Sequence, residues 1–182
     1  MRTLVVYASK HGATRGIAER IAMRLGEAGL QAEARQAAAA GSLADWDALV
    51  IGSAVYAGRW QKEASHLVRR NRAVLASKPV WLFSSGPLGT EAVDAKGHDA
   101  KAAAEPKEIA ELAALIGAQD HRVFFGALDP DNLGTAGRLM RKTAAGAALL
   151  PAGDFRDWAE IETWAGQVAR ELRPEPSAQP SR

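Results

Sequence analysis

The chain has 182 residues, of which 47% are hydrophobic, and carries a formal net charge of +2 with a pI of about 9.1. This length suits one α/β domain and is short for two. The sequence contains no cysteine, which excludes disulfides, thiolate metal sites, iron–sulfur clusters and cysteine nucleophiles. The mild basic balance does not indicate a nucleic-acid-binding protein.

The sequence gives no sign of a membrane span or a leader. No apolar run reaches the roughly eighteen residues that a membrane-spanning helix needs. Met1 leads directly into a strand pattern rather than a signal peptide. We therefore expect a cytoplasmic protein.

Short apolar runs alternate with helical patterns along the chain, which is typical of a parallel sheet with helices on both faces. Strands are expected at residues 4–8, 30–35, 47–53, 79–85 and 121–128, the second of them at an edge. Helices are expected from residue 15 to the stop at Gly29, over 62–76, 106–116 and 133–150, and from a cap at Asp154 to residue 172. The pattern predicts one doubly wound domain of five strands.

Two segments lack any strand or helix period. Residues 90–104 are small, polar and charged, and predict an exposed loop inserted after the fourth strand. Residues 174–182 are rich in Pro and Ser and predict a disordered tail. The folded domain is therefore expected to span residues 1–173.

The turn after the first strand predicts a phosphate site. A helix start leaves about four backbone N–H groups unpaired and carries roughly half a positive charge, which suits an anion. Ser9 and Thr14 add hydroxyl donors, and the small residues between them allow close approach. The turn has neither G-x-G-x-x-G nor G-x-x-x-x-G-K-[ST], the patterns of dinucleotide and nucleoside triphosphate sites. A plain turn between strand and helix remains the alternative.

Three loops are expected to meet at one end of the sheet. In open α/β sheets the ligand lies beyond the carboxyl ends of the strands, where the strand order reverses. The loops at 9–14, 54–60 and 84–89 follow the first, third and fourth expected strands. They are rich in Gly, Ser, Tyr and Trp, which suits a flat ring bonded at its edge and stacked on its face. Glycines would allow the ring close to the backbone at Gly52, Gly58 and Gly86.

Several side chains of these loops have two possible roles. Tyr56 is expected to stack on the ring, while Trp60 either stacks or anchors the following helix in the core. Arg59 lies either beside the ring or in solvent. His11 either touches the phosphate or contributes only its backbone N–H. The remaining histidines, His66, His98 and His121, have no metal-ligand partners in the sequence and are interpreted as incidental; no metal is expected.

The motifs S-K-H-G-A-T at 9–14 and G-S-A-V-Y-A-G at 52–58 resemble the cofactor loops of the flavodoxin superfamily, and the resemblance extends over residues 1–173. It implies a three-layer α/β/α sandwich with a five-stranded parallel sheet in the order 2-1-3-4-5 and an inserted loop after strand 4. It also implies FMN as the cofactor. The cofactor-binding residues carried over are Ser9, Lys10, His11, Gly12, Ala13, Thr14, Ser53, Ala54, Val55, Tyr56, Ala57, Gly58, Ser84, Ser85, Gly86, Pro87, Leu88 and Gly89.

Within the superfamily the chain looks most like the menaquinone-dependent protoporphyrinogen IX dehydrogenases. The similar segments are Gly126-Ala127-Leu128, the basic stretch at 139–142 and Asp157-Trp158. The chain departs from that branch at 55–58, which is less basic and aromatic. Its inserted loop also has few aromatic or arginine side chains to hold a porphyrin. The resemblance implies an FMN-dependent oxidoreductase linked to a quinone or a porphyrinogen, and thereby to heme biosynthesis.

Other functions stay open. A non-catalytic electron carrier would serve a redox partner protein, although flavodoxin carriers are characteristically acidic and this chain is not. A domain that has lost its flavin is a third possibility. A receiver-type module needs acidic residues at the ends of strands one and three, where this chain has Ala8-Ser9 and Gly52-Ser53. No catalytic side chain is singled out, and the oligomeric state is left open.

The basic stretch from Arg138 to Lys142 also has two interpretations. Its cations, Arg138, Arg141 and Lys142, lie in a segment without acids. They either meet an anionic membrane surface, where each cation contributes about 1 kcal/mol, or form the solvated face of a packed helix. The first interpretation implies peripheral contact with the inner face of the membrane.

Overall fold

The structure is a computed structural model that describes residues 1–89, 93, 97 and 99–173. The expected disordered tail, residues 174–182, lies outside the described residues. Five parallel strands form the central sheet: β1 (Arg2–Ala8), β2 (Gln31–Gln36), β3 (Ala48–Tyr56), β5 (Val80–Ser85) and β6 (Asp120–Phe124). Their order is β2-β1-β3-β5-β6. This is the predicted order once the short strand β4 (Arg59–Trp60), which pairs only with the end of β3, is left aside.

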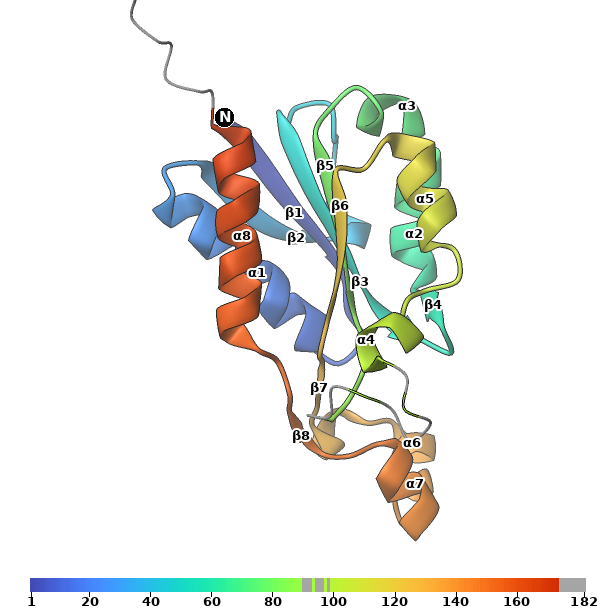
Figure 1. The fold of residues 1–182 in the computed structure, drawn as a ribbon. Coiled ribbons are helices and arrows are strands. Elements are labelled where there is room, and N and C mark those ends of the chain that lie inside the picture. Colours follow the sequence, from blue (N-terminus) through green and yellow to red (C-terminus); the bar gives the residue numbers. More distant parts are fainter. Residues whose placement is uncertain (90–92, 94–96, 98, 174–182) are drawn as a thin grey trace, which may run out of the picture.

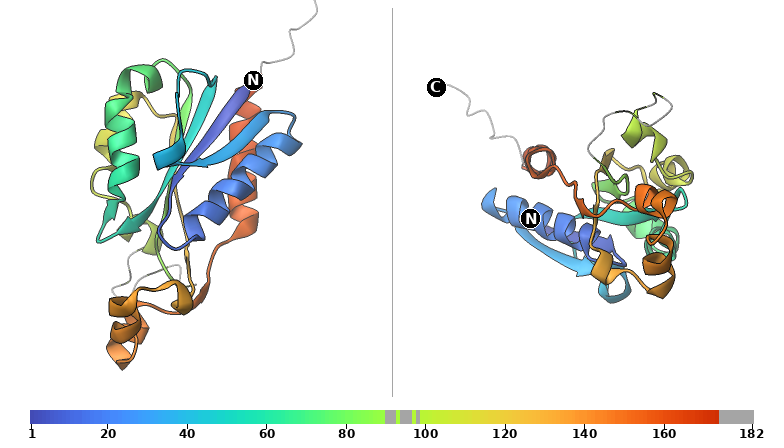
Figure 2. Two further views of the ribbon diagram at one scale, coloured as in Figure 1. Left: turned by 180° about the vertical axis from the view of Figure 1, so that it is seen from behind. Right: turned by 90° about the horizontal axis from the view of Figure 1, so that it is seen from below.

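Helices cover both faces of the sheet and make three layers (Figures 1 and 2). One face carries α1 (Ala13–Glu27) and α8 (Trp158–Leu172), and the other carries α2 (Lys62–Arg70), α3 (Arg72–Leu75) and α5 (Ile109–Ile116). The flavodoxin-like α/β sandwich predicted from the sequence is therefore confirmed. Within the described part of the chain, no helix combines the length and the apolar character needed to cross a bilayer.

The alternation of side chains along the inner strands explains why their sequences are apolar without a break. In β1, Leu4 and Val6 belong to the core beneath α2 and α5, whereas Val5 belongs to the core beneath α1 and α8. A strand of a parallel sheet is buried on both faces, so both sets of alternate positions must be apolar. The edge strand β2 is half-exposed and polar at alternate positions, as expected for its place in the order.

The core beneath α8 is held by aromatic packing. Phe83, Phe124 and Trp164 lie with ring centroids 5.6–6.4 Å apart in tilted or edge-to-face arrangements. The indole of Trp164 also donates a hydrogen bond of 2.8 Å to Asp120. Because Trp164 lies on α8 and Phe83 and Phe124 lie on β5 and β6, this cluster fixes the last helix against the far side of the sheet.

The segment predicted as one helix at 133–150 is two short helices, α6 (Thr135–Met140) and α7 (Ala144–Leu149). The hydroxyl of Thr143 accepts a hydrogen bond from the N–H of Gly146 at 3.0 Å and begins the second helix. Gly146 packs so closely on the carbonyl of Met140 that a Cβ there would overlap it. The chain therefore turns back on itself at Arg141–Thr143 instead of continuing the helix.

We call residues 129–152, which contain these helices, the arm. The arm leaves the sheet after β7 (Ala127–Leu128), begins with the 3₁₀ turn η2 (Pro130–Asn132) and returns at β8 (Gly153–Asp154). The strands β7 and β8 pair as an antiparallel ribbon. In Figure 1 the arm projects beyond the carboxyl ends of the parallel strands, away from the helical layers.

Other predicted boundaries differ from the structure for local reasons. The last helix is capped by Asp157, which accepts a hydrogen bond from the N–H of Glu160 at 3.0 Å, and not by Asp154, which lies in β8. The expected helix at 62–76 is interrupted at Asn71.

In the expected inserted loop at 90–104, the described residues include a short helix, α4 (Ala100–Ala103). Asp99 caps it by accepting N–H bonds from Lys101 and Ala102. Elsewhere, a 3₁₀ turn, η1 (Ala37–Ala39), follows β2.

Replacing Gly52 by Ala is expected to destabilise the protein. Gly52 lies in β3 directly beneath the ring of Phe83, and a Cβ at that position would overlap ring atoms. Overpacking a rigid core of this kind costs about 1–3 kcal/mol. We expect the free energy of unfolding, measured by urea denaturation, to fall by that amount in Gly52→Ala.

Gly26→Ala is the matched control. Gly26 is an exposed position of α1, where a Cβ meets nothing within 4 Å. An alanine at such a site raises stability by up to about 1 kcal/mol. Equal losses of stability in the two variants would contradict the close packing of Gly52 against Phe83.

Candidate functional site

A cavity of about 360 Å³ lies at the carboxyl end of the sheet, between the loops after β1, β3 and β5 and the arm. Its volume is in the range of small-molecule and cofactor sites. The residues that line it are Ser9, His11, Ala13, Thr14, Ala54, Val55, Tyr56, Ala57, Ser85, Gly86, Leu88, Gly126, Ala127, Leu128, Leu133, Ala148, Leu150 and Pro151. Among the described residues, the lining contains no Asp, Glu, Lys or Arg.

The loop after β1 presents the N-terminus of α1 to this cavity. Gly12 adopts a left-handed conformation (φ +89°) and is the N-cap of the 15-residue α1. Its own N–H donates to the hydroxyl of Ser9 at 3.1 Å, which closes the turn. In the described structure, no side chain caps α1 and its first turn has no acidic residue. The first N–H groups and the positive end of the helix dipole therefore face the cavity without a competing carboxylate.

The hydroxyl of Thr14 is a second feature at the start of α1 that suits a polar ligand. Its side chain is 1% exposed and lines the cavity. Its hydroxyl has no hydrogen-bond partner among the described residues. A buried hydroxyl without a partner costs about 1–3 kcal/mol, so this arrangement favours a polar ligand group at the start of α1.

The segment predicted as a loop at 54–60 is instead a tight hairpin. The strand β3 continues to Tyr56, and β4 pairs back on it with Tyr56 opposite Arg59. Ala57 and Gly58 between them have φ values of +51° and +69°, the combination of a type I′ turn. Ala57 is strained in this region at a cost of roughly 1–2 kcal/mol. The hairpin must be held firmly by its surroundings to keep this shape.

Trp60 is the residue that holds the hairpin. It is 4% exposed, and its indole N–H donates to the hydroxyl of Ser84 at 2.8 Å. Its backbone N–H donates to Glu108 at 3.0 Å. The N–H of Lys107 donates in turn to the carbonyl of Gly58 at 3.1 Å. Trp60 is thus a core anchor, and the alternative in which it stacks on a ligand is wrong.

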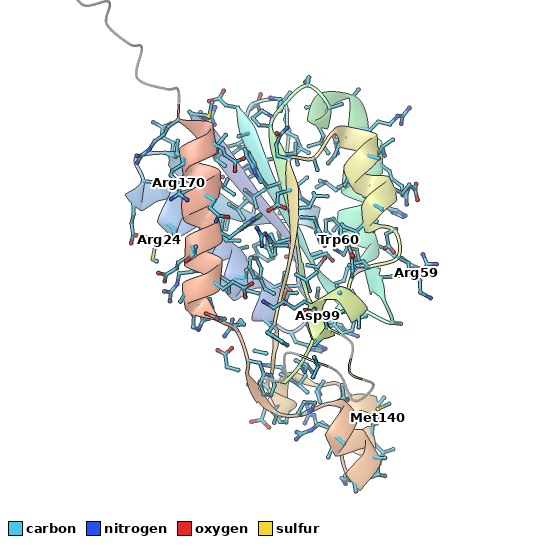
Figure 3. The ribbon with its side chains drawn as sticks, viewed as in Figure 1. Arg24, Arg59, Trp60, Asp99, Met140 and Arg170 are labelled. Carbon is cyan, nitrogen blue, oxygen red and sulfur yellow. The ribbon has the colours of Figure 1, made fainter. Side chains whose placement is uncertain are left out.

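Tyr56 and Arg59 point in different directions from this hairpin. Tyr56 lines the cavity, is 46% exposed, and meets the ring of His11 edge-on at a centroid distance of 6.3 Å. Partial burial raises the pKa of its phenol, so it remains a neutral aromatic surface. Arg59 lies at the outer edge of the molecule whereas Trp60 points inward (Figure 3). Its side chain is 67% exposed, which agrees with the solvated interpretation, and its guanidinium lies 3.9 Å from Glu108.

His121, interpreted from the sequence as incidental, belongs to a buried network below the cavity. Its Nε2 lies 2.9 Å from the hydroxyl of Ser84. In the neutral tautomer that carries its proton on Nδ1, Nε2 can accept the proton of this hydroxyl, which itself accepts from Trp60. Nδ1 lies 3.7 Å from Glu105. Burial lowers the pKa of His121 to about 4, only partly opposed by Asp120.

Comparisons with known proteins agree with this architecture. A family model described as "Flavodoxin domain" matches residues 4–146. The chain belongs to the flavodoxin domain family. A search of curated proteins finds no match.

Solved structures of flavodoxins share the fold. Flavodoxin 2 from Bacillus cereus is 18% identical, with a TM-score of 0.60 and coverage of 94% of this chain and 100% of that one. The flavodoxin of Streptococcus pneumoniae TIGR4 is 16% identical, with a TM-score of 0.59 and the same coverages. Rubredoxin oxygen:oxidoreductase from Desulfovibrio gigas is 15% identical, with a TM-score of 0.57 and coverage of 94% of this chain but 36% of its own length. At sequence identities this low, the similarity shows a shared fold and nothing about function.

The structure brings together most of the site residues predicted from the flavodoxin motifs. Those that line the cavity are Ser9, His11, Ala13, Thr14, Ala54, Val55, Tyr56, Ala57, Ser85, Gly86 and Leu88. Others lie in the same loops without lining it: Lys10, Gly12, Gly58, Pro87 and Gly89.

Two predicted residues and one glycine have other roles. The hydroxyl of Ser53 is buried, accepts from the N–H of Gln61 at 2.9 Å and donates to the carbonyl of Ala54. Ser84 is buried between Trp60 and His121. Neither lines the cavity, because alternate residues of β3 and β5 point into the sheet's faces and away from its end. Gly52 makes room for Phe83 and not for a ligand.

The sequence missed the far wall of the cavity. It is formed by β7, the arm and the residue before β7: Gly126, Ala127, Leu128, Leu133, Ala148, Leu150 and Pro151. A continuous strand at 121–128 and a continuous helix at 133–150 would have carried them away from the cavity. One signal was present: no acid occurs between Asp131 and Asp154, a stretch of small, apolar and basic residues.

His121 is expected to make the stability of the protein depend on pH. Its pKa of about 4 in the folded state lies below the value of about 6.5 in an unfolded chain. The unfolded state therefore binds the proton more readily, and stability is lost as the pH falls from 6.5 towards 4. As the pH falls from 7.5 to 4.5, the titration of His121 should lower the free energy of unfolding by about 2–3 kcal/mol.

The measurement is urea denaturation of the wild type and of His121→Gln, which keeps an amide near Ser84 but does not titrate. We expect the free energy of unfolding of the wild type to fall more steeply with acid than that of the variant, by the amount given above. Parallel pH profiles for the two proteins would show that His121 is not buried in its neutral form.

Proposed function

We propose that this protein is an FMN-dependent oxidoreductase that exchanges electrons with a neutral quinone. The buried hydroxyl of Thr14, without a partner among the described residues at the start of α1, is the main support for FMN, because it adds a donor where the 5′-phosphate would lie. The flavodoxin domain family implies a flavin, and FMN is the typical one. When bound, FMN supplies the redox chemistry.

The residues around the cavity fit the two ends of FMN. Ser9, Thr14 and the first N–H groups of α1 would hold the phosphate. Tyr56 would lie against one face of the ring system, and the loop of Ser85 and Gly86 would meet its edge through backbone groups. Gly86 has little room to spare, since a Cβ there would lie 3.0 Å from Val55. We propose the cavity-lining residues of the three loops as the cofactor site, within a domain of residues 1–173.

The far wall of the cavity supports a neutral acceptor. Leu128, Leu133 and Leu150 contribute apolar surface there, and no charged side chain lines it within the described structure. A quinone ring is uncharged and suits such a wall. A porphyrinogen carries several carboxylates, for which this lining offers no cation. We therefore favour the quinone over the porphyrinogen and over a place in heme biosynthesis.

We further propose that the arm brings the protein to an anionic membrane surface, where a lipid-soluble quinone resides. Leu139 and Met140 are 66% and 51% exposed at its tip, and Figure 3 shows Met140 far from the sheet. Arg138 and Lys142 are exposed beside them. Apolar side chains among cations, without acids, are typical of interfacial binding to anionic lipids.

The first test is cofactor binding. The purified protein is expected to be yellow, to keep its colour on gel filtration and to release FMN with acid. Thr14→Val should raise the dissociation constant for FMN about ten- to hundredfold, the effect of losing one hydrogen bond to a charged group. The ligand-free variant should be no less stable than the wild type, because a hydroxyl without a partner has been removed. Fluorescence titration and thermal unfolding measure the two effects.

Thr3→Val is the matched control. The hydroxyl of Thr3 is also buried without a partner in the described structure, but it lies at the opposite end of β1. Its removal should leave the FMN affinity unchanged. A colourless wild-type protein that takes up no added FMN would exclude the proposed function and the carrier alternative together.

The second test separates enzyme from carrier. The reduced protein is expected to be reoxidised by a water-soluble neutral quinone under anaerobic conditions, followed by the return of the visible flavin band. Leu150→Asp places a charge in the apolar wall and should slow this step about tenfold, while reoxidation by ferricyanide stays unchanged. Desolvating a carboxylate against an apolar ligand costs at least the corresponding energy of about 1.4 kcal/mol.

Leu139→Asp provides the crossed control, because Leu139 lies on the arm but outside the cavity. The Leu139→Asp variant should reduce quinone at the wild-type rate but should no longer sediment with vesicles that contain phosphatidylglycerol. The Leu150→Asp variant should still bind these vesicles. If the protein reduces a ferredoxin-type protein but no quinone, it is a non-catalytic electron carrier.

A further inference from the structure

Arg156, which follows the arm, contacts the end of the loop at residues 9–14, here called the phosphate loop. Its Nη1 donates a hydrogen bond of 3.2 Å to the carbonyl of Ala13, the first residue of α1 and part of the cavity lining. The two residues are 143 positions apart in the chain. The guanidinium also pairs with Asp154 through Nε at 2.7 Å and Nη2 at 2.5 Å. Its position is thus fixed from two sides.

The surroundings of Arg156 are built to receive it. Gly16, one turn along α1, has no side chain, and a Cβ there would lie 2.5 Å from Nη1. The guanidinium stacks on the ring of Trp158 at 4.4 Å, and Arg20 lies near the same ring at 4.8 Å. The Arg156 side chain is only 17% exposed. An arginine held on a flat ring with its fork bonded is one of the more rigid placements of a positive charge in proteins.

The positive charge of Arg156 lies beside the phosphate loop, and in the described structure that loop directs no charged side chain of its own into the cavity. The lining of the cavity, within the described residues, includes no Lys or Arg. A partly buried charge is screened less than one in open solvent. Arg156 therefore adds positive potential to that of the helix dipole at the place where a phosphate would bind.

Asp154 opposes this effect. Its hydrogen bonds with Arg156 lower the pKa of the carboxyl group, so Asp154 is ionised at neutral pH. It holds Arg156 in place but also cancels part of its charge. The pair thus has one member that favours an anion at the phosphate loop and one that disfavours it.

We propose that Arg156, balanced by Asp154, determines how strongly this protein prefers the phosphorylated flavin FMN over unphosphorylated riboflavin. Arg156 acts at a distance of one hydrogen bond from the loop and is a specificity-determining residue without contact to the ring system. The proposal rests on the proposed function, since it takes the cavity to be a flavin site.

The test compares dissociation constants for FMN and riboflavin, measured by fluorescence titration of the ligand-free protein. In Arg156→Gln the preference for FMN should fall about tenfold, mostly through weaker FMN binding, as expected for removing a fixed, partly buried charge. In Asp154→Asn, which keeps an acceptor for Arg156 but removes the negative charge, the preference should rise about threefold. Added salt should weaken both effects.

Arg20→Gln is the matched control. Arg20 lies near the same Trp158 ring but pairs with Glu162 at 2.5 Å, and within the described residues no hydrogen bond joins its side chain to the phosphate loop. Its removal should leave the preference unchanged. If Arg156→Gln is too unstable to titrate, the opposite shift in Asp154→Asn still decides the question.

The outcomes separate the two proposals. A wild-type protein that binds neither flavin contradicts the proposed function. A wild-type protein that prefers FMN, together with an unchanged preference in Arg156→Gln or Asp154→Asn, overturns this inference alone. Equal losses of FMN and riboflavin affinity in Arg156→Gln would also overturn it, because they would reveal a purely structural role.

Discussion

The arrangement of this molecule depends on one constraint: a parallel sheet that must be buried on both faces. Val5 packs under α1 and α8 while its neighbours Leu4 and Val6 pack under α2 and α5, so both faces are taken by helices. What remains accessible is the carboxyl end of the strands. The loops after β1, β3 and β5 must therefore share that end, and the cavity lies between them. The position of the candidate site follows from the way in which the core is filled.

The same constraint explains why the polar groups near the cavity divide into two sets. Ser53, Ser84 and His121 lie where the strands are still covered by helices. Ser53 bonds to Gln61, while Ser84 bonds to both Trp60 and His121. Thr14 lies one step beyond, at the first turn of α1, and its hydroxyl has no partner among the described residues. The buried set holds the β3–β4 hairpin in a strained turn. The unpartnered hydroxyl of Thr14 is available to a ligand.

The arm changes a common fold into a particular molecule. It closes the far side of the cavity with leucines, presents Leu139 and Met140 at its tip, and is followed by Asp154 and Arg156 beside the first turn of α1. The arm and the residues that follow it therefore connect the far wall of the cavity, the outer surface and the loop after β1. A change in the arm is expected to affect all three.

The sequence by itself indicated the five strands, the two-sided core and the three loops, because these depend on local periodicity and on turn residues such as Gly12 and Gly58. The resemblance to the flavodoxin superfamily supplied the strand order. It also indicated most of the residues that line the cavity. The tertiary structure alone decided that Trp60 is an anchor, that Ser53 and Ser84 lie beneath the cavity, and that Asp157 rather than Asp154 caps α8. It also decided that the arm forms the far wall and that Arg156 reaches Ala13. Apart from the Asp157 cap, which joins residues three positions apart, these depend on contacts between residues tens to more than a hundred positions apart, whose geometry no local pattern encodes.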